Sequence, residues 1–165
     1  MSLTHFGFDA NHDHAHCESA ALADAKALCQ SRGLRLTPIR EHVLTLIWQS
    51  HKPLGAYEIL PQLAEAGFNS APPTVYRALE FLQEQGFVHR IASLNAFIGC
   101  PSPDHQHSGY FLICRSCQNA VEMNGADAEA FIHHQANALG FQVETVATEV
   151  SGLCPNCSQA QEAKS

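Results

Sequence analysis

The sequence predicts an α+β protein in two parts: a winged helix-turn-helix unit, followed by a smaller α/β unit that carries a four-cysteine metal site. Helical patterns followed by a short β-hairpin fill the first part. Strand patterns around one helix fill the second part, which also contains two Cys-x-x-Cys pairs. We expect a flexible His-rich tail over 1–17, a winged-helix DNA-binding domain over 18–93, a hinge over 94–107 and a dimerisation and zinc-binding domain over 108–165.

The N-terminal part begins with a tail and two predicted helices. Residues 1–17 are rich in histidine and poor in apolar residues, so we expect a mobile tail there. The first helix is predicted over 19–32, where Ala and Leu recur at helical spacing and Gly33 supplies the stop. Thr37 and Pro38 fit the N-cap and the first position of a second helix.

Two further helices are predicted over 56–67 and 72–86, and a hairpin follows them. Pro61 lies inside the third helical pattern, so we expect it to kink or split that helix. Short strands are expected over 87–93 and 96–100, the second of which overlaps the start of the expected hinge. Helices that end in an amphipathic helix and a hairpin are typical of a winged helix-turn-helix, whose last helix enters the major groove of DNA.

The C-terminal part changes to strand patterns after a turn-rich connector. We expect strands and one helix, in chain order strand 110–114, strand 120–123, helix 127–139 and strand 141–150. The polar residues from Ser158 onward are expected to be frayed. These elements predict a compact α/β unit.

The charge of the chain is unevenly distributed. The formal net charge is −7, which alone argues against a nucleic-acid partner. However, seven of the nine basic residues precede Ile91. The basic residues therefore lie in the part that resembles a DNA-binding unit, and a double-stranded DNA partner remains the expectation.

Composition also limits where the chain is expected to work. No apolar run reaches the roughly 18 residues that cross a bilayer, so we expect no membrane span. The first sixteen residues lack the basic and apolar regions of a secretory signal, so we expect a cytoplasmic protein. In a reducing compartment, paired cysteines bind metal more often than they form disulfides.

The strongest motif is the pair of knuckles Cys114-x-x-Cys117 and Cys154-x-x-Cys157. Two intervening residues let both thiolates of a knuckle face one ion, and two knuckles complete a tetrahedral four-thiolate shell. Such a closed shell has no open position, so it predicts a structural zinc site. A disulfide framework or a redox-active Cys-x-x-Cys is the alternative.

A second, looser cluster has mixed ligand types. Its members lie at the hairpin, in the connector and after the first knuckle: His89, Cys100, His105, His107 and Glu122. Nitrogen, sulfur and oxygen ligands from different elements suit zinc, and the thiolate disfavours hard cations. For each residue taken singly, a surface histidine or a buried free cysteine is the alternative.

The fourth predicted helix also bears a candidate DNA-reading set. Thr74, Tyr76 and Arg77 lie in its first turns, where side chains reach base edges. Arginine can bind a purine edge with two hydrogen bonds, and tyrosine can pack on a thymine methyl or bond to a phosphate. The alternative is that Tyr76 belongs to the core and Arg77 is a solvated charge.

These segments resemble the Fur superfamily of metal-dependent repressors. The residues that carry the resemblance are RLTPIREHVL, AYEIL and PPTVYRALEFLQEQGFVHR, followed by the paired knuckles, and the match spans about residues 20–157. Within the superfamily the chain is similar to the zinc uptake regulators. Iron-type members carry a contiguous HHDH-like cluster, whereas this chain has DHQH over 104–107 with Cys100 upstream, which favours zinc.

The resemblance implies a homodimeric, zinc-responsive repressor of zinc uptake and homeostasis genes that binds a pseudo-palindromic operator. It implies at least two zinc ions per subunit, a structural one and a regulatory one. Their implied ligands are Cys114, Cys117, Cys154 and Cys157 for the structural zinc, and His89, Cys100, His107 and Glu122 for the regulatory zinc, with His105 as the alternative to His107. It also implies DNA contacts from Tyr76 and Arg77, and from Arg35 near the minor groove.

The resemblance implies one further metal site, because some members add a site that uses a helix histidine. Here His133 or His134 with His105 could serve.

Other functions remain as alternatives. A zinc deaminase would need its H-x-E motif, here His16-Cys17-Glu18, in a packed element, and its cysteine pair preceded by proline; neither is expected here, so we predict no enzyme. A zinc-binding module without DNA function would also use the knuckles. Within the superfamily, a sensor of iron, manganese, nickel or peroxide is the remaining alternative.

Overall fold

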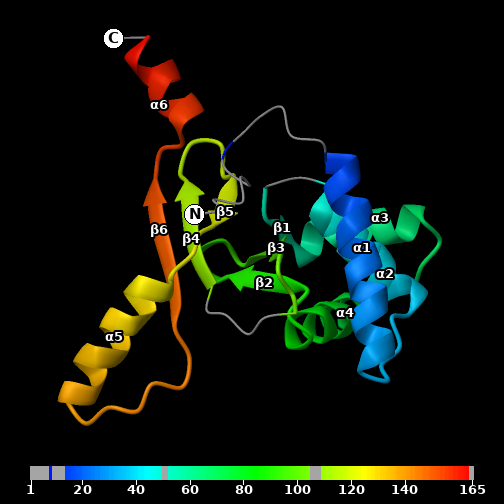
Figure 1. Cartoon of the computed structure of the whole chain (residues 1–165). Coiled ribbons are helices and arrows are strands. Elements are labelled where there is room, and N and C mark those ends of the chain that lie inside the picture. The colour runs from blue at the N-terminus through cyan, green and yellow to red at the C-terminus, as the bar shows by residue number, and fades with distance from the viewer. Residues whose placement is uncertain (1–7, 9–13, 50–51, 105–108, 164–165) are drawn as a thin grey trace. The chain divides into compact units, whose positions relative to one another are not determined.

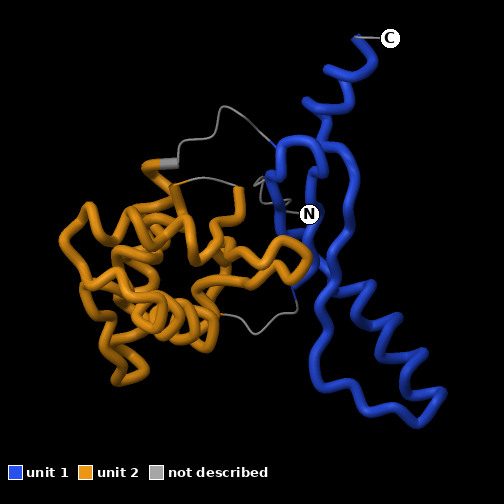
Figure 2. Tube along the Cα trace, turned by 180° about the vertical axis from the view of Figure 1, so that it is seen from behind, with its two compact units in different colours: residues 1–8, 107–165 blue, residues 9–106 orange. Residues whose placement is uncertain are grey.

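The computed structural model describes residue 8 and residues 14–49, 52–104 and 109–163 (Figure 1). They form two compact units (Figure 2). The N-terminal unit comprises the described residues of 9–106, and the C-terminal unit comprises those of 107–165 together with Phe8. None of the described helices is long and apolar enough to cross a membrane.

Helices dominate the N-terminal unit. Its elements are α1 (His14–Ser31), α2 (Pro38–Trp48), β1 (Leu54–Gly55), α3 (Ala56–Glu65), α4 (Pro72–Glu84), β2 (Val88–Ile91), the short 3₁₀ helix η1 (Ala92–Leu94) and β3 (Ala96–Gly99). The four α-helices and the wing hairpin therefore follow the predicted order. Because β3 belongs to this unit, the expectation of a hinge over 94–107 is wrong for residues 96–99.

Helix α1 begins earlier than its apolar pattern indicates. It starts at His14, so the expectation of a flexible tail over 1–17 is wrong for residues 14–17. The core contacts of this helix come from later turns, where Ala25 and Cys29 are buried and Leu22 and Leu28 pack against the same core. No Gly or Pro interrupts the first turns, so the helix can extend through them. Because these exposed turns bury no apolar residue, the apolar periodicity of the sequence does not reveal where the helix begins.

Helix α3 is continuous through Pro61, so the expected split is wrong. Proline at this position removes one donor, the N–H that would bond to the carbonyl of Tyr57. Ile59 and Leu63, on either side of the proline, are fully buried in the core. Packing of these side chains therefore offsets the loss of a single hydrogen bond.

The core of the N-terminal unit lies between the helices. Its fully buried side chains include Val43 and Leu44 of α2, Val75 and Leu82 of α4, and Phe87, which precedes the wing.

Thr37 is the N-cap of α2 and Pro38 its first residue, as predicted, although the Thr37 side chain makes no capping hydrogen bond.

The wing is a three-stranded sheet with the order β1-β3-β2. Strands β2 and β3 are antiparallel, with Val88 opposite Gly99 and Ile91 opposite Ala96. The two-residue β1 adds to the other edge of β3 and was not predicted, because Pro53 and Gly55 read as a turn and two residues are too few for an alternating pattern.

The C-terminal unit is an α/β layer built on one small sheet. Its elements are β4 (Gly109–Cys114), β5 (Ala120–Glu122), α5 (Ala126–Ala138), β6 (Ala147–Gly152) and α6 (Pro155–Glu162). The strand order is β5-β4-β6, with β4 antiparallel to β5 and parallel to β6. The parallel register runs from Gly109↔Ala147 to Cys114↔Gly152.

Two expectations for this unit are wrong. Residues 141–146 are not in a strand, because the register with β4 begins only at Ala147. The residues after Ser158 are helical rather than frayed, since α6 runs from Pro155 to Glu162. Pro155 occupies the first turn with Cys154 as N-cap, which is the arrangement that proline favours at a helix start.

Candidate metal centre and nucleic-acid interface

The parallel pairing of β4 with β6 brings the two knuckles to the same end of the sheet. Cys114 ends β4 opposite Gly152, and the N–H of Arg115 donates to the Gly152 carbonyl at 2.9 Å. In the first knuckle, the N–H of Gln118 donates to the Cys114 carbonyl at 2.8 Å, and Gln118 adopts φ 63°. The chain therefore turns back tightly before β5, which keeps Cys117 near Cys114.

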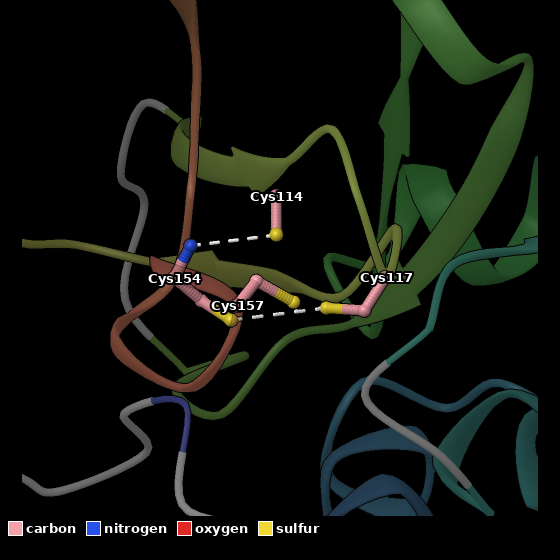
Figure 3. A group of neighbouring side chains, drawn as sticks. All are labelled: Cys114, Cys117, Cys154 and Cys157. Carbon is pink, nitrogen blue, oxygen red and sulfur yellow. Dashed lines mark hydrogen bonds between the residues drawn. The ribbon is translucent and has the colours of Figure 1, made fainter. Parts of the chain in front are cut away.

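The second knuckle is formed by the start of α6. Cys154 is the N-cap residue and Cys157 lies in the first turn. Figure 3 shows the four side chains converging from the two knuckles. The first turn of α6 thus holds Cys154 and Cys157 close together, as the tight turn after β4 does for Cys114 and Cys117.

The distances among the four thiols fit one zinc ion. All four Sγ atoms lie within 4.8 Å of one another, and those of Cys117 and Cys154 are 3.9 Å apart. Zinc–sulfur bonds of about 2.3 Å place two thiolates of a tetrahedron about 3.8 Å apart. The disulfide alternative requires a sulfur–sulfur bond of about 2.05 Å, and none of the seven cysteines forms a disulfide.

Backbone donors prepare the first knuckle for metal. The N–H of Cys154 points at the Cys114 Sγ from 3.4 Å (Figure 3). Backbone hydrogen bonds from Cys117 and Cys154 lower the pKa of Cys114 to about 6, whereas burial raises the pKa of Cys117 to about 12. Of the two thiols of this knuckle, Cys114 therefore loses its proton more readily than Cys117.

The second predicted ligand set divides between the two units. In the N-terminal unit, His89 on β2 and Cys100 after β3 offer ligand atoms within 4.8 Å of each other. Cys100 is buried, and its N–H donates to the Phe87 carbonyl at 2.9 Å. Glu122 ends β5 in the C-terminal unit and is half-buried. His105 and His107 lie outside the described residues.

The residues of the implied third site lie on α5. His133 Nε2 is 3.8 Å from Glu129 Oε1 one turn earlier, and His134 is exposed. Their implied partner His105 is outside the described residues, so this site remains a prediction.

Helix α4 presents the predicted DNA-reading residues away from the core. Val75 and Leu79 are buried on one side of the helix, whereas Arg77 is exposed and Tyr76 keeps 40% of its surface exposed. The alternative that Tyr76 is a core residue is therefore wrong. Thr74 is half-buried, and Arg35, which precedes α2, is exposed.

Tyr57 is an exposed aromatic residue of the N-terminal unit that the sequence reasoning missed. Tyr57 lies in the first turn of α3 and is 76% exposed. The buried positions of this helix are Ala56, Ile59 and Leu63. Tyr57 falls off that stripe, which is the signal that could have identified it as a surface residue.

The same segments match known proteins. Residues 31–151 match the sequence profile described as the ferric uptake regulator family. The zinc uptake regulation protein of Escherichia coli strain K12 is 38% identical over 141 residues, which are 85% of this chain and 82% of that protein.

Solved structures give the same similarity in three dimensions. A zinc uptake regulator complexed with zinc and DNA has a TM-score of 0.84 and 37% identity, over 88% of this chain and 97% of that one. The crystal structure of holo XcZur has a TM-score of 0.79 and 48% identity, over 86% of this chain and 99% of that one.

Proposed function

The chain belongs to the ferric uptake regulator family, and we propose that within it the protein is a zinc-responsive, DNA-binding repressor of zinc uptake and homeostasis genes. The observation that carries the proposal is the similarity over 88% of the chain to a zinc uptake regulator complexed with zinc and DNA. The protein is thus a transcription regulator and not an enzyme. As a regulator that acts on DNA, it would work in the cytoplasm.

The four-cysteine set is the structural zinc site of this proposal. Cys114, Cys117, Cys154 and Cys157 would hold the ion with a complete tetrahedral shell. When bound, zinc supplies a crosslink between the end of β4 and the start of α6. The chain contributes the backbone N–H groups that stabilise the Cys114 thiolate. Residues on either side of α5 are thereby fixed together, which stabilises the C-terminal unit.

The second ligand set is the regulatory site. His89 and Cys100 come from the wing and its exit, Glu122 comes from the C-terminal unit, and His107, with His105 as the alternative, comes from the connector. A cysteine in this set supports zinc over iron, because thiolates favour softer metals. Binding by residues of both units would restrict how the units move relative to each other.

The energetics allow such a switch. A nearly complete shift between two conformations needs about 5.5 kcal/mol of differential binding. Zinc sites in peptides have apparent binding free energies of roughly 10–16 kcal/mol, so a fraction of one site's binding energy is enough. Linkage requires that DNA tighten zinc binding by the same factor by which zinc tightens DNA binding.

The N-terminal unit reads DNA in this proposal. Tyr76, Arg77 and Thr74 project from the first turns of α4 toward base edges and phosphates of the major groove. Arg35 lies next to the minor groove. The exposure of Tyr76 and Arg77, neither of which the core requires, supports this assignment.

Apolar surface on the C-terminal unit supports a homodimer. Large apolar side chains are exposed there: Met123, Phe131, Leu139, Phe141 and Val150. A protein of this size exposes such a group when another surface covers it. A second copy related by a two-fold axis would place two α4 helices on two half-sites, which accounts for a pseudo-palindromic operator.

Metal selectivity tests the proposal. The zinc-loaded protein is used to select binding sites from a random-sequence duplex library, and the recovered sequence, here called the selected duplex, is labelled. Metal content is measured after purification, and binding of the selected duplex is then titrated with zinc or with iron(II). We expect zinc alone to support tight binding at micromolar concentrations or below. Equal or better activation by iron(II) would assign the protein to the iron-sensing members instead.

A further inference from the structure

Arg32, the first residue after α1, contacts two segments that are distant in sequence. Its Nη1 donates to the carbonyl of Gln85 at 2.9 Å and to the Gln85 side-chain oxygen at 3.3 Å. Its Nη2 donates to the carbonyl of Pro103 at 3.5 Å. Gln85 is the C-cap of α4, and Pro103 lies three positions after Cys100. One guanidinium therefore joins the end of the DNA-reading helix to the segment that follows a predicted zinc ligand.

The end of α4 needs a cation that the helix does not provide. The last four carbonyls of a helix lack partners within it and carry partial negative charge. Helix α4 has no basic residue in its last turn and ends at Glu84, which adds negative charge. Arg32 supplies the positive charge from α1 and bonds directly to the C-cap carbonyl.

The connector approaches α4 closely at the same place. Gly86 has φ +79°, and a side-chain carbon placed on it would lie 3.5 Å from the Pro103 carbonyl oxygen. The guanidinium carbon of Arg32 also lies 6.0 Å from the ring centroid of Phe87, whose carbonyl accepts the N–H of Cys100. The contacts of Arg32, Phe87 and Pro103 thus link the C-terminal end of α4 to the segment around Cys100.

The residue before Cys100 is fixed as well. A Cβ on Gly99 would clash with Cε2 of Trp48, so the indole of α2 packs directly on the Gly99 backbone. The segment 99–103 is therefore held to the helices on both sides of Cys100. A change in the position of Cys100 cannot be absorbed by a loose loop and is passed to these contacts.

We propose that Arg32 is a positioning residue that couples the Cys100 segment to the C-terminal end of α4, so that holding Cys100 in a metal site holds α4 in its DNA-reading orientation. This inference rests on the proposed zinc-dependent DNA binding. Arg32 does not need to touch zinc or DNA for this role. Its planar fork can donate to two carbonyls at once, whereas a lysine ammonium acts as a single point charge.

The test compares three variants in the full-length, zinc-loaded protein. Arg32→Gln removes the charge and the fork, and Arg32→Lys keeps only the charge. Lys26→Gln is the matched control, because it removes one positive charge from the same helix α1 but at a residue paired with Glu41 of α2. For each variant, affinity for the selected duplex is measured with the regulatory zinc present and with it removed by a chelator. The ratio of the two dissociation constants is the coupling factor.

We expect Arg32→Gln to lower the coupling factor about tenfold, which corresponds to about 1.4 kcal/mol, and Arg32→Lys to lower it by a smaller factor. Lys26→Gln should stay within about twofold of the unchanged protein. Because coupling is reciprocal, the factor by which DNA tightens zinc binding should fall equally in Arg32→Gln. A residue that only stabilises the fold would leave that reciprocal factor unchanged.

Three outcomes would overturn the inference. The coupling factor of Arg32→Gln could equal that of the unchanged protein. Affinity could fall equally with and without zinc, with the salt dependence reduced by about one phosphate contact, which would make Arg32 a direct DNA contact. Finally, Lys26→Gln could lower the factor as much as Arg32→Gln. By contrast, an unchanged protein with no zinc dependence at all would refute the proposed function.

Discussion

Cys117 and Cys154 are 37 positions apart in the chain, yet their sulfur atoms lie 3.9 Å apart. The parallel pairing of β4 with β6 explains this proximity, because it brings the turn after one strand beside the helix start after the other. Because of the same pairing, a metal ion bound by both knuckles would crosslink the two ends of the segment from β4 to α6. Loss of one ligand should therefore affect the C-terminal unit as a whole.

Replacing a structural ligand should unfold or dissociate the protein. Cys114→Ser removes a thiolate from a shell that contributes on the order of 10 kcal/mol in zinc-binding peptides, comparable to the entire stability of a typical domain at roughly 5–15 kcal/mol. Zinc content, circular dichroism and size-exclusion chromatography measure the result. We expect loss of bound zinc together with loss of the dimer. A folded dimer with full zinc content would contradict the four-cysteine assignment.

Zinc affinity at the four-cysteine site should depend on pH more steeply below about pH 6. The pKa of Cys114 is lowered to about 6 by backbone hydrogen bonds from Cys117 and Cys154, so above that pH this ligand binds metal without releasing a proton. Below it, one more proton competes with each zinc ion, and affinity falls faster as pH decreases. Competition with a chelating indicator between pH 5 and pH 7.5 measures this slope. A slope that stays constant across pH 6 would contradict the lowered pKa.

A side chain at Gly99 should destabilise the N-terminal unit. The Cβ of Gly99→Ala would meet the rigid indole of Trp48, which is the only tryptophan, and overpacking of this kind costs about 1–3 kcal/mol. Urea denaturation followed by circular dichroism gives the change in unfolding free energy. Gly152→Ala is the control, because nothing lies within 4 Å of its Cβ. Equal stability of the two variants would show that Trp48 does not pack on Gly99.

Removing the exposed arginine of α4 should weaken sequence-specific binding. Arg77→Ala loses a contact to a base edge or phosphate, which costs about 1–3 kcal/mol, while the content of both zinc sites stays unchanged. Gln83→Ala, also exposed on α4 but in its last turn, is the control. Fluorescence anisotropy with the selected duplex and with a scrambled duplex measures specificity. Unchanged discrimination between the two duplexes in Arg77→Ala would exclude Arg77 from base reading.

The parts of the fold that could be predicted from the sequence are those with a local physical signature. Helices α2 and α4 carry buried stripes and proline at their starts, and the knuckles carry their own spacing. The exposed start of α1 and the two-residue β1 carry no such signature, because neither buries enough residues to set a period. The start of β6 at Ala147 depends on its register with β4, which no local pattern encodes.

The same distinction applies to the sites. The Cys-x-x-Cys spacing predicted the four-cysteine metal site, because the two ligands of each pair are close in sequence. The donors that lower the pKa of Cys114 include the backbone N–H of Cys154, which only the fold brings near. Arg32 lies 53 positions from Gln85 and 71 positions from Pro103, so no local sequence pattern could predict these contacts.

In the proposed mechanism, a labile ion bound by the second ligand set, which includes His89 and Cys100, switches DNA binding on. The most direct test titrates zinc into protein in which only the four-cysteine site is filled and follows binding of the labelled selected duplex, with Cys100→Ser measured in parallel. We predict that zinc increases the affinity of the unchanged protein at least about tenfold, and that Cys100→Ser remains a folded dimer with no increase. Equal DNA affinity before and after addition of zinc, or a full zinc response in Cys100→Ser, would show that zinc at the second ligand set does not control DNA binding.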